Sequence, residues 1–139
     1  MEILLPQNQA PPNEPSKPQP IRILMVDDDK HILRLGDMVL KQLKHDVIIC
    51  AEPSKALSII NENRDITLLI TDVLMPGVSG QELYNQAKEI IPSLKCIFVS
   101  GYSSDVIDPA QLSSPHCRFL NKPFSVDTLG HAIKALSAR

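Results

Sequence analysis

The feature that most restricts the fold of this chain is a regular alternation, from Ile21 onward, of short apolar runs and amphipathic segments. Five runs have the length and composition of strands: IRILMV, DVIIC, ITLLIT, KCIFVS and HCRFLN. The segments between them place apolar residues every three or four positions, which is typical of a helix with one buried face. We therefore predict an α/β fold with a five-stranded parallel sheet covered by helices on both faces.

Five segments are predicted to be helical. They are KHILRLGDMVLKQLK, PSKALSIINEN, SGQELYNQAKEII, SSDVIDPAQLS and SVDTLGHAIKALS. The second opens with proline, which suits the first turn of a helix, and the fourth has a weak and broken pattern. In the last segment Val126, Leu129, Ile133 and Leu136 share one face.

The first twenty residues have a different composition. The stretch PQNQAPPNEPSKPQP carries six of the twelve prolines of the chain and has no apolar periodicity. We expect residues 1–20 to form an extended linker or tail and residues 21–139 to form one domain. The stub MEILLP before the linker is either the last strand of a preceding domain or a simple tail.

Charge and composition exclude several classes of function. The net charge of −2 provides no basic surface for nucleic acid, and no apolar run reaches membrane-spanning length. We therefore expect no nucleic-acid partner and no membrane contact by this segment. Cys50, Cys96 and Cys117 are expected to be buried free thiols in a reducing compartment, which indicates a cytoplasmic location. The four histidines, which are His31, His45, His116 and His131, are expected to be exposed.

Polar residues follow the predicted strands where each strand ends. In parallel sheets the chemistry gathers at the carboxyl ends of the strands. The residues at those ends are Asp27, Asp28, Asp29, Asp72, Ser100 and Lys122. Each alone has an ordinary explanation, such as a helix cap, a turn or a solvated lysine. Together, at four strand ends, they predict a functional site.

Several carboxylates in one place must be balanced by solvent, protonation or a cation. Two carboxylates about 4 Å apart repel by about 4 kcal/mol at an effective dielectric near 20. Because no histidine or cysteine accompanies them in the sequence, the oxygen-rich pocket suits Mg²⁺. Asp72 is placed to attack phosphorus and form an acyl phosphate, with Lys122 stabilising the phosphoryl oxygens and Ser100 donating a hydrogen bond to one of them.

These motifs resemble the receiver domain of two-component response regulators. The resemblance covers Ile21 to Ala138 and rests on VDDD, DVLMPGVSG, VSGY and KPF, which occur in the family's order and spacing. It implies a flavodoxin-like, doubly wound fold with strand order 2-1-3-4-5. It also implies that Asp72 is the phosphoacceptor and that the domain catalyses its own phosphotransfer and dephosphorylation.

The resemblance also implies the ligands of the metal. Mg²⁺ is expected to bind Asp28, Asp72 and the backbone carbonyl of Leu74 directly, and Asp27 through water. Asp29 is then left to cap the first helix. The peptide bond between Lys122 and Pro123 is expected to be cis, as is usual in the family.

A conformational switch is a further expectation from the family. Phe119 occupies the position of an aromatic switch residue, three residues before Lys122. On phosphorylation Ser100 would move toward the pocket, Phe119 would fill the space behind it and Tyr102 would shift. The alternative is that Phe119 is a fixed residue of the core.

The last expectations concern the parent protein and its partners. FVSGY and FLNKPF are similar to receivers of hybrid sensor histidine kinases, and a free-standing single-domain regulator is the alternative. The implied partners are a histidine kinase, or its dimerisation or phosphotransfer domain, and a downstream histidine phosphotransfer protein. A metal-dependent phosphatase is disfavoured because Leu74 stands where that class needs a second acid. A receiver-like domain that is never phosphorylated is disfavoured because the acids, the acceptor and the lysine are all present.

Overall fold

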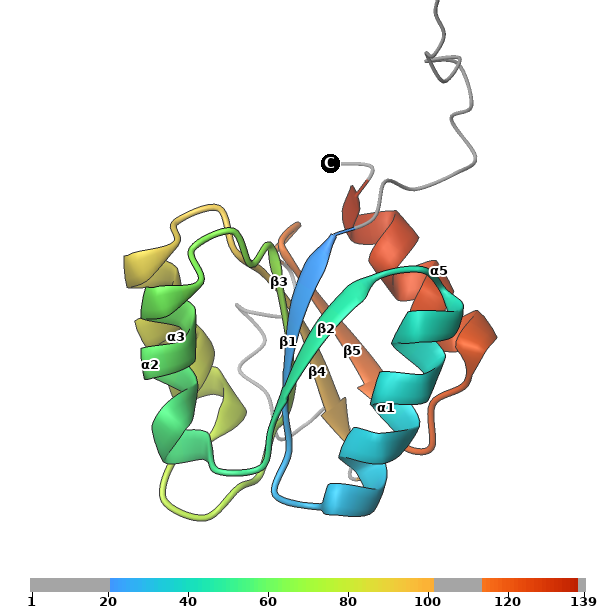
Figure 1. Ribbon diagram of the computed structural model, residues 1–139, viewed down its shortest axis with the longest axis horizontal. Helices are drawn as coiled ribbons and strands as arrows, with labels where there is room; N and C mark the ends of the chain where they lie inside the picture. Colours follow the sequence, from blue (N-terminus) through green and yellow to red (C-terminus); the bar gives the residue numbers. More distant parts are fainter. Residues whose placement is uncertain (1–20, 102–113, 138–139) are drawn as a thin grey trace, which may run out of the picture.

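The computed structural model of the protein describes residues 21–101 and 114–137, which form one parallel sheet with helices on both faces (Figure 1). Its strands are β1 (Arg22–Val26), β2 (Asp46–Cys50), β3 (Leu68–Asp72), β4 (Lys95–Ser100) and β5 (Cys117–Asn121). Its helices are α1 (Lys30–Gln42), α2 (Ala56–Glu62), α3 (Gly80–Ile90) and α5 (Val126–Ser137), with a 3-10 turn, η2 (Pro53–Lys55), ahead of α2. Within the described ranges no helix is long and apolar enough to cross a membrane.

The strands lie in the order β2-β1-β3-β4-β5, and every neighbouring pair is parallel. This arrangement confirms the predicted flavodoxin-like topology. The order changes direction at β1, because the chain moves outward to β2 and then crosses back to β3 on the other side of β1. Such a crossover point opens a crevice at the carboxyl ends of the strands, which is where ligands bind in open α/β sheets.

Two apolar cores lie on the two faces of the sheet. Helices α1 and α5 cover one face, and α2 and α3 cover the other (Figure 1). Successive strand residues point to opposite faces, so Ile23 belongs to the core beneath α1 and α5 while Leu24 belongs to the core beneath α2 and α3. Both are fully buried. The sheet is therefore apolar on both faces, as parallel sheets with helical cover are.

Side-chain caps fix where two of the helices begin. Asp29 is the N-cap of α1 and accepts a hydrogen bond from the backbone N–H of His31, which confirms the predicted cap. Ser79 caps α3 in a reciprocal pair with Glu82: each side chain accepts from the other residue's backbone N–H. Asp29 lies three residues after Val26, where β1 ends, and Ser79 lies in the loop after β3, so each cap fixes the helix that follows a strand of the site.

The three cysteines are buried and free, as predicted. The expectation that the histidines are exposed was wrong at His45, which is buried, and at His116, which is half-buried. The Nδ1 atom of His45 accepts a hydrogen bond from the backbone N–H of Ile21, at 3.2 Å, where the chain enters β1. Burial lowers the pKa of His45 below its ordinary value, because the charged form loses its hydration. The predicted helix SSDVIDPAQLS falls in residues 103–113, outside the described residues.

Candidate functional site

The carboxylates predicted to share a site do meet at the carboxyl edge of the sheet. Strands β1 and β3 are neighbours, with Val26 opposite Thr71, so the residues that follow each of them lie side by side. Carboxylate oxygens of Asp27, Asp28 and Asp72 all lie within 4.8 Å of one another. Asp27 is buried, Asp28 is exposed and Asp72 lies between these extremes, so the cluster opens to solvent on one side.

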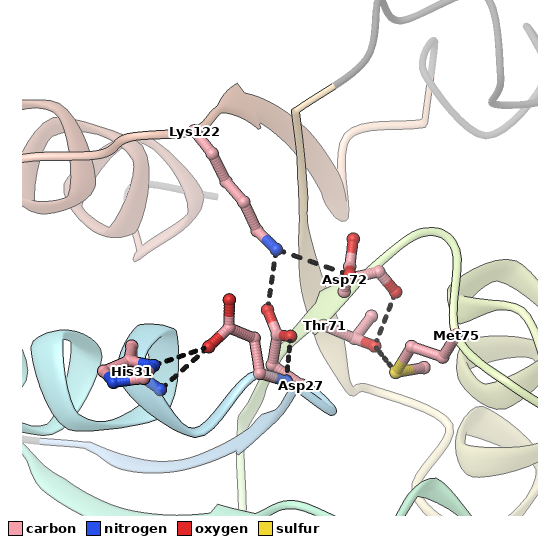
Figure 2. Close-up of polar contacts among 7 residues, drawn as sticks. Asp27, His31, Thr71, Asp72, Met75 and Lys122 are labelled. Carbon is pink, nitrogen blue, oxygen red and sulfur yellow. Dashed lines mark hydrogen bonds and ion pairs between the residues drawn. The ribbon is translucent and has the colours of Figure 1, made fainter.

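Lys122 extends from the loop after β5 into this acidic cluster (Figure 2). Its Nζ atom lies 2.9 Å from Asp27 Oδ2 and 3.3 Å from Asp72 Oδ2. The lysine therefore bridges two of the carboxylates, while Asp28 completes the cluster at its solvent side. The second oxygen of Asp27 accepts the backbone N–H of Asp29, at 2.9 Å, which orients the carboxylate.

Burial and charge act in opposite directions on these groups. Burial raises the pKa of Asp27, although its hydrogen bonds from Asp29 and Lys122 act against that shift. For Lys122 the effect of burial is to lower the pKa, but the hydrogen bonds and charges of Asp27 and Asp72 outweigh it and the pKa is raised. Lys122 is thus a fixed cation beside the acceptor.

The backbone around Lys122 is held against β4. The Lys122–Pro123 bond is cis, as predicted. The backbone N–H of Lys122 donates to the carbonyl of Ser100 at 2.8 Å, which ties the last residue of β4 to the lysine loop. Ser100 itself is fully buried, opposite Asn121 of β5.

The remaining predicted residues lie around this edge. Leu74 is exposed in the loop after β3, next to the acceptor, with its side chain 48% accessible. Phe119 lies on β5 opposite Phe98 and packs, partly buried, against the core beneath α2 and α3. Tyr102 lies outside the described residues.

Two neighbours of the acceptor were not among the predicted site residues. Thr71 is fully buried, and its hydroxyl donates to the carbonyl of Asp72 at 3.0 Å. Gly80, the first residue of α3, packs directly on the Asp72 peptide. The predicted helix SGQELYNQAKEII already placed Gly80 at the start of α3, but it did not predict the contact with the Asp72 peptide.

The cluster has the chemistry of a site for a hard divalent cation. In the described ranges the acidic group consists of Asp27, Asp28 and Asp72, so all its side-chain donors are carboxylate oxygens. Mg²⁺ prefers oxygen ligands, often one or two carboxylates together with water. The exposed side of the cluster leaves room for water, so the residues present fit the metal.

Comparison with known proteins agrees with this geometry. The response regulator receiver domain family matches residues 23–134. The response regulator receiver protein CpdR of Brucella abortus (strain 2308) is 30% identical over 115 residues, covering 83% of this chain and 95% of CpdR. The sensor kinase CckA of the same strain is also 30% identical over 115 residues, covering 82% of this chain but 12% of CckA.

A further relative matches this chain over only a small part of its own length. The virulence sensor protein BvgS of Bordetella pertussis is 36% identical over 135 residues, covering 90% of this chain and 11% of BvgS. This chain therefore corresponds to nearly all of CpdR but to a small part of CckA and BvgS.

Among solved structures, a receiver domain protein from Clostridium thermocellum superposes with a TM-score of 0.77 at 26% identity, covering 86% of this chain and 95% of that one. The receiver domain of the hybrid histidine kinase CckA superposes with a TM-score of 0.70 at 31% identity, covering 84% and 98%. With this fold, this acidic edge and these matches, the chain belongs to the response regulator receiver domain family.

Proposed function

We propose that this receiver accepts a phosphoryl group from a phosphohistidine onto Asp72. The observation that supports this most strongly is the position of Lys122, whose ammonium contacts both Asp27 and Asp72 inside a cluster of three carboxylates. The cluster leaves Asp72 partly accessible, as an acceptor must be. A fixed cation next to a partly accessible carboxylate favours attack on a negatively charged phosphoryl group.

The transfer forms one bond and breaks one. A carboxylate oxygen of Asp72 attacks phosphorus, the phosphorus–nitrogen bond of the donor breaks, and the imidazole nitrogen keeps the electron pair. The product is an acyl phosphate on Asp72. Lys122 lies 3.3 Å from the attacking carboxylate and offsets charge on the phosphoryl oxygens. The hydroxyl of Ser100 at the end of β4 is the proposed donor to one of those oxygens.

We assign the metal of the reaction as Mg²⁺. Asp28, Asp72 and the backbone carbonyl of Leu74 would hold it directly, and Asp27 through water. When bound, it supplies positive charge that lowers the repulsion between the carboxylates and the incoming phosphoryl group. Asp27 holds Lys122 in the cluster by its 2.9 Å contact.

Phosphorylation is proposed to switch the face formed by the predicted fourth helix, β5 and α5. Ser100, Phe119 and Tyr102 are the proposed switch residues. Phe119 is only partly buried, so a move of its ring into space vacated by Ser100 would bury it further, and burying such a ring contributes about 1.5–3 kcal/mol. NMR spectra of the free and beryllofluoride-bound protein test this. Shift changes confined to Asp72 and Ser100, with none at Phe119, would leave Phe119 as a fixed core residue.

For the parent protein, we propose a hybrid sensor histidine kinase with this receiver at the end of the chain. The match to BvgS covers 90% of this chain. Residues 21–139 alone make up less than nine tenths of the chain, so the match must also include some of residues 1–20, the predicted linker. The match to CpdR supports the alternative, a free-standing regulator. An immunoblot of the native protein decides: a band at 15.4 kDa would favour the free-standing form.

The partners proposed are a histidine kinase, or its dimerisation or phosphotransfer domain, and a downstream histidine phosphotransfer protein, all in the cytoplasm. Residues 1–20 are proposed as the linker to a preceding domain. Amide exchange tests the linker, since strong protection across residues 7–13 would contradict an extended chain.

Labelling with acetyl phosphate tests the site itself. The wild type with Mg²⁺ should gain one phosphoryl group, and both Asp72→Asn and Asp28→Ala should gain none. Glu89→Gln, on the exposed face of α3, is the matched control and should be labelled like the wild type. Normal labelling of Asp28→Ala would contradict the assignment of Asp28 as a metal ligand. An unlabelled wild type would favour a receiver-like domain that is never phosphorylated.

A further inference from the structure

The start of α3 lies directly behind the phosphoacceptor. Its first residue, Gly80, is buried, and its backbone N–H donates to the carbonyl of Val73 at 2.8 Å. Ser79 caps the same turn through the backbone N–H of Glu82. The first turn of α3 is therefore fixed both to the end of β3 and by its own cap, so it forms a rigid support beside Asp72.

The absence of a side chain at Gly80 is what allows this contact. A Cβ atom at position 80 would overlap the carbonyl oxygen of Asp72, and it would lie 3.2 Å from the Asp72 carbonyl carbon and 3.1 Å from Thr71 Cγ2. Gly80 does not have the positive φ that favours glycine, in contrast to Gly77 with φ of 87°. The requirement at position 80 is therefore space, not backbone conformation.

A Cβ atom at position 80 would meet main-chain atoms. In this respect Gly80 differs from the other helical glycines of the described ranges, where the added atom would meet side chains. At Gly36 an added Cβ would meet the Met25 side-chain end, which can rotate away. At Gly130 it would lie 3.4 Å from Leu43 Cδ2, close to ordinary contact. An alanine at position 80 could be accommodated only by moving α3 or the peptide of Asp72.

Two further hydrogen bonds hold the peptide of Asp72. The hydroxyl of Thr71 donates to the Asp72 carbonyl at 3.0 Å, and the backbone N–H of Val73 donates to Val99 on β4 at 3.3 Å. The peptide thus lies between the sheet and the first turn of α3. Its position sets where the carboxylate projects, and hence the 3.3 Å contact with Lys122.

We propose that Gly80 is a positioning residue for phosphotransfer: the bare backbone at the start of α3 seats against the Asp72 peptide and fixes the carboxylate relative to Lys122 and the other two aspartates. This inference rests on the proposed function of Asp72. It assigns to Gly80 a role in the reaction, through Asp72, in addition to packing.

The test compares Gly80→Ala with Gly130→Ala, which makes the same chemical change in α5. An error of about 1 Å in the position of a reacting group can cost about 100-fold in rate. We expect Gly80→Ala to be labelled by acetyl phosphate at least about tenfold more slowly than the wild type. Its dissociation constant for Mg²⁺, followed by NMR, should rise about tenfold, as for residues that orient metal ligands. Gly130→Ala should match the wild type in both.

The melting temperature and the carboxyl carbon shift of Asp72 in the metal-free proteins complete the comparison. A changed Asp72 shift in a folded Gly80→Ala protein supports displacement of the carboxylate. A folded Gly80→Ala protein with the wild-type labelling rate, Mg²⁺ affinity and Asp72 shift would overturn the proposal.

Two outcomes need a separate readout. If the wild type itself is not labelled, the proposed function has failed, and the Asp72 shift alone then decides the role of Gly80. If Gly80→Ala does not fold, Ser79→Ala serves instead, because it loosens the first turn of α3 without adding an atom. Slower labelling and a moved Asp72 shift in Ser79→Ala support the proposal, and wild-type values in that folded variant overturn it.

Discussion

The ammonium of Lys122 lies closer to Asp27, at 2.9 Å, than to Asp72, at 3.3 Å. Asp27 is the most buried of the three clustered acids, and its pKa is raised by that burial. A buried carboxylate needs a partner, so Lys122 first compensates Asp27. One lysine for three carboxylates leaves negative charge at Asp28 and Asp72, which a bound cation would offset.

The first prediction is that this excess charge costs stability when the metal is absent. Asp28→Asn should raise the free energy of unfolding of the metal-free protein by on the order of 1 kcal/mol, because it removes one like charge from an exposed side of the cluster. Urea denaturation in the presence of a chelator measures this. Glu89→Gln, away from the cluster, is the control, and an equal gain in both variants would refute the charge argument.

The second prediction is that Mg²⁺ stabilises the fold through the same residues. Ligand binding to the native state adds about 2.7 kcal/mol at a concentration 100 times the dissociation constant. The melting temperature of the wild type should therefore rise with Mg²⁺ concentration, and that of Asp28→Asn should not. Equal rises in the two proteins would place the metal elsewhere.

The third prediction concerns pH. The pKa of buried His45 is lowered in the folded state, so the unfolded state binds more protons below about pH 6.5. Its contribution to stability is full above that pH and is lost as the pH falls through the lowered pKa. His45→Asn, which keeps an acceptor for the Ile21 N–H, should flatten stability between pH 7 and pH 5. Exposed His131→Asn should not, and a wild-type slope in His45→Asn would contradict the assignment.

The sequence predicted the sheet, its order and the acidic site for a physical reason. Apolar runs such as KCIFVS have strand bounds that match the structure, Lys95–Ser100, because a strand buried on both faces must be apolar throughout. Asp27, Asp72 and Lys122 then meet because the carboxyl ends of parallel strands share one edge of the sheet. The apolar pattern of each strand and the parallel order of the strands are therefore enough to predict which residues lie together at this edge.

The features that were missed depend on packing that no periodicity records. His45 is polar and follows a helix, so its sequence context does not indicate burial. It is nevertheless buried, and it accepts a hydrogen bond from the backbone N–H of Ile21. The contact of Gly80 with the peptide of Asp72 depends on how α3 is seated, which the spacing of residues 72–80 does not specify.

The fourth prediction concerns the last turn of α5. The Nζ atom of Lys95, at the start of β4, donates to the carbonyl of Leu136 at 2.6 Å and so satisfies one of the carbonyls left free at the helix end. Lys95→Met should lower the free energy of unfolding by about 1 kcal/mol. Amide exchange should become faster in α5 and remain unchanged in α3. Lys134→Met, exposed on the same helix, is the control, and equal losses would refute the cap.

The most direct test of the account is phosphotransfer from a radiolabelled, autophosphorylated histidine kinase domain to this receiver with Mg²⁺, followed by mapping of the modified residue. Transfer should occur to Asp72, should be much slower in Lys122→Met and should be absent in Asp72→Asn. Label on another residue, or transfer that persists in Asp72→Asn, would contradict it.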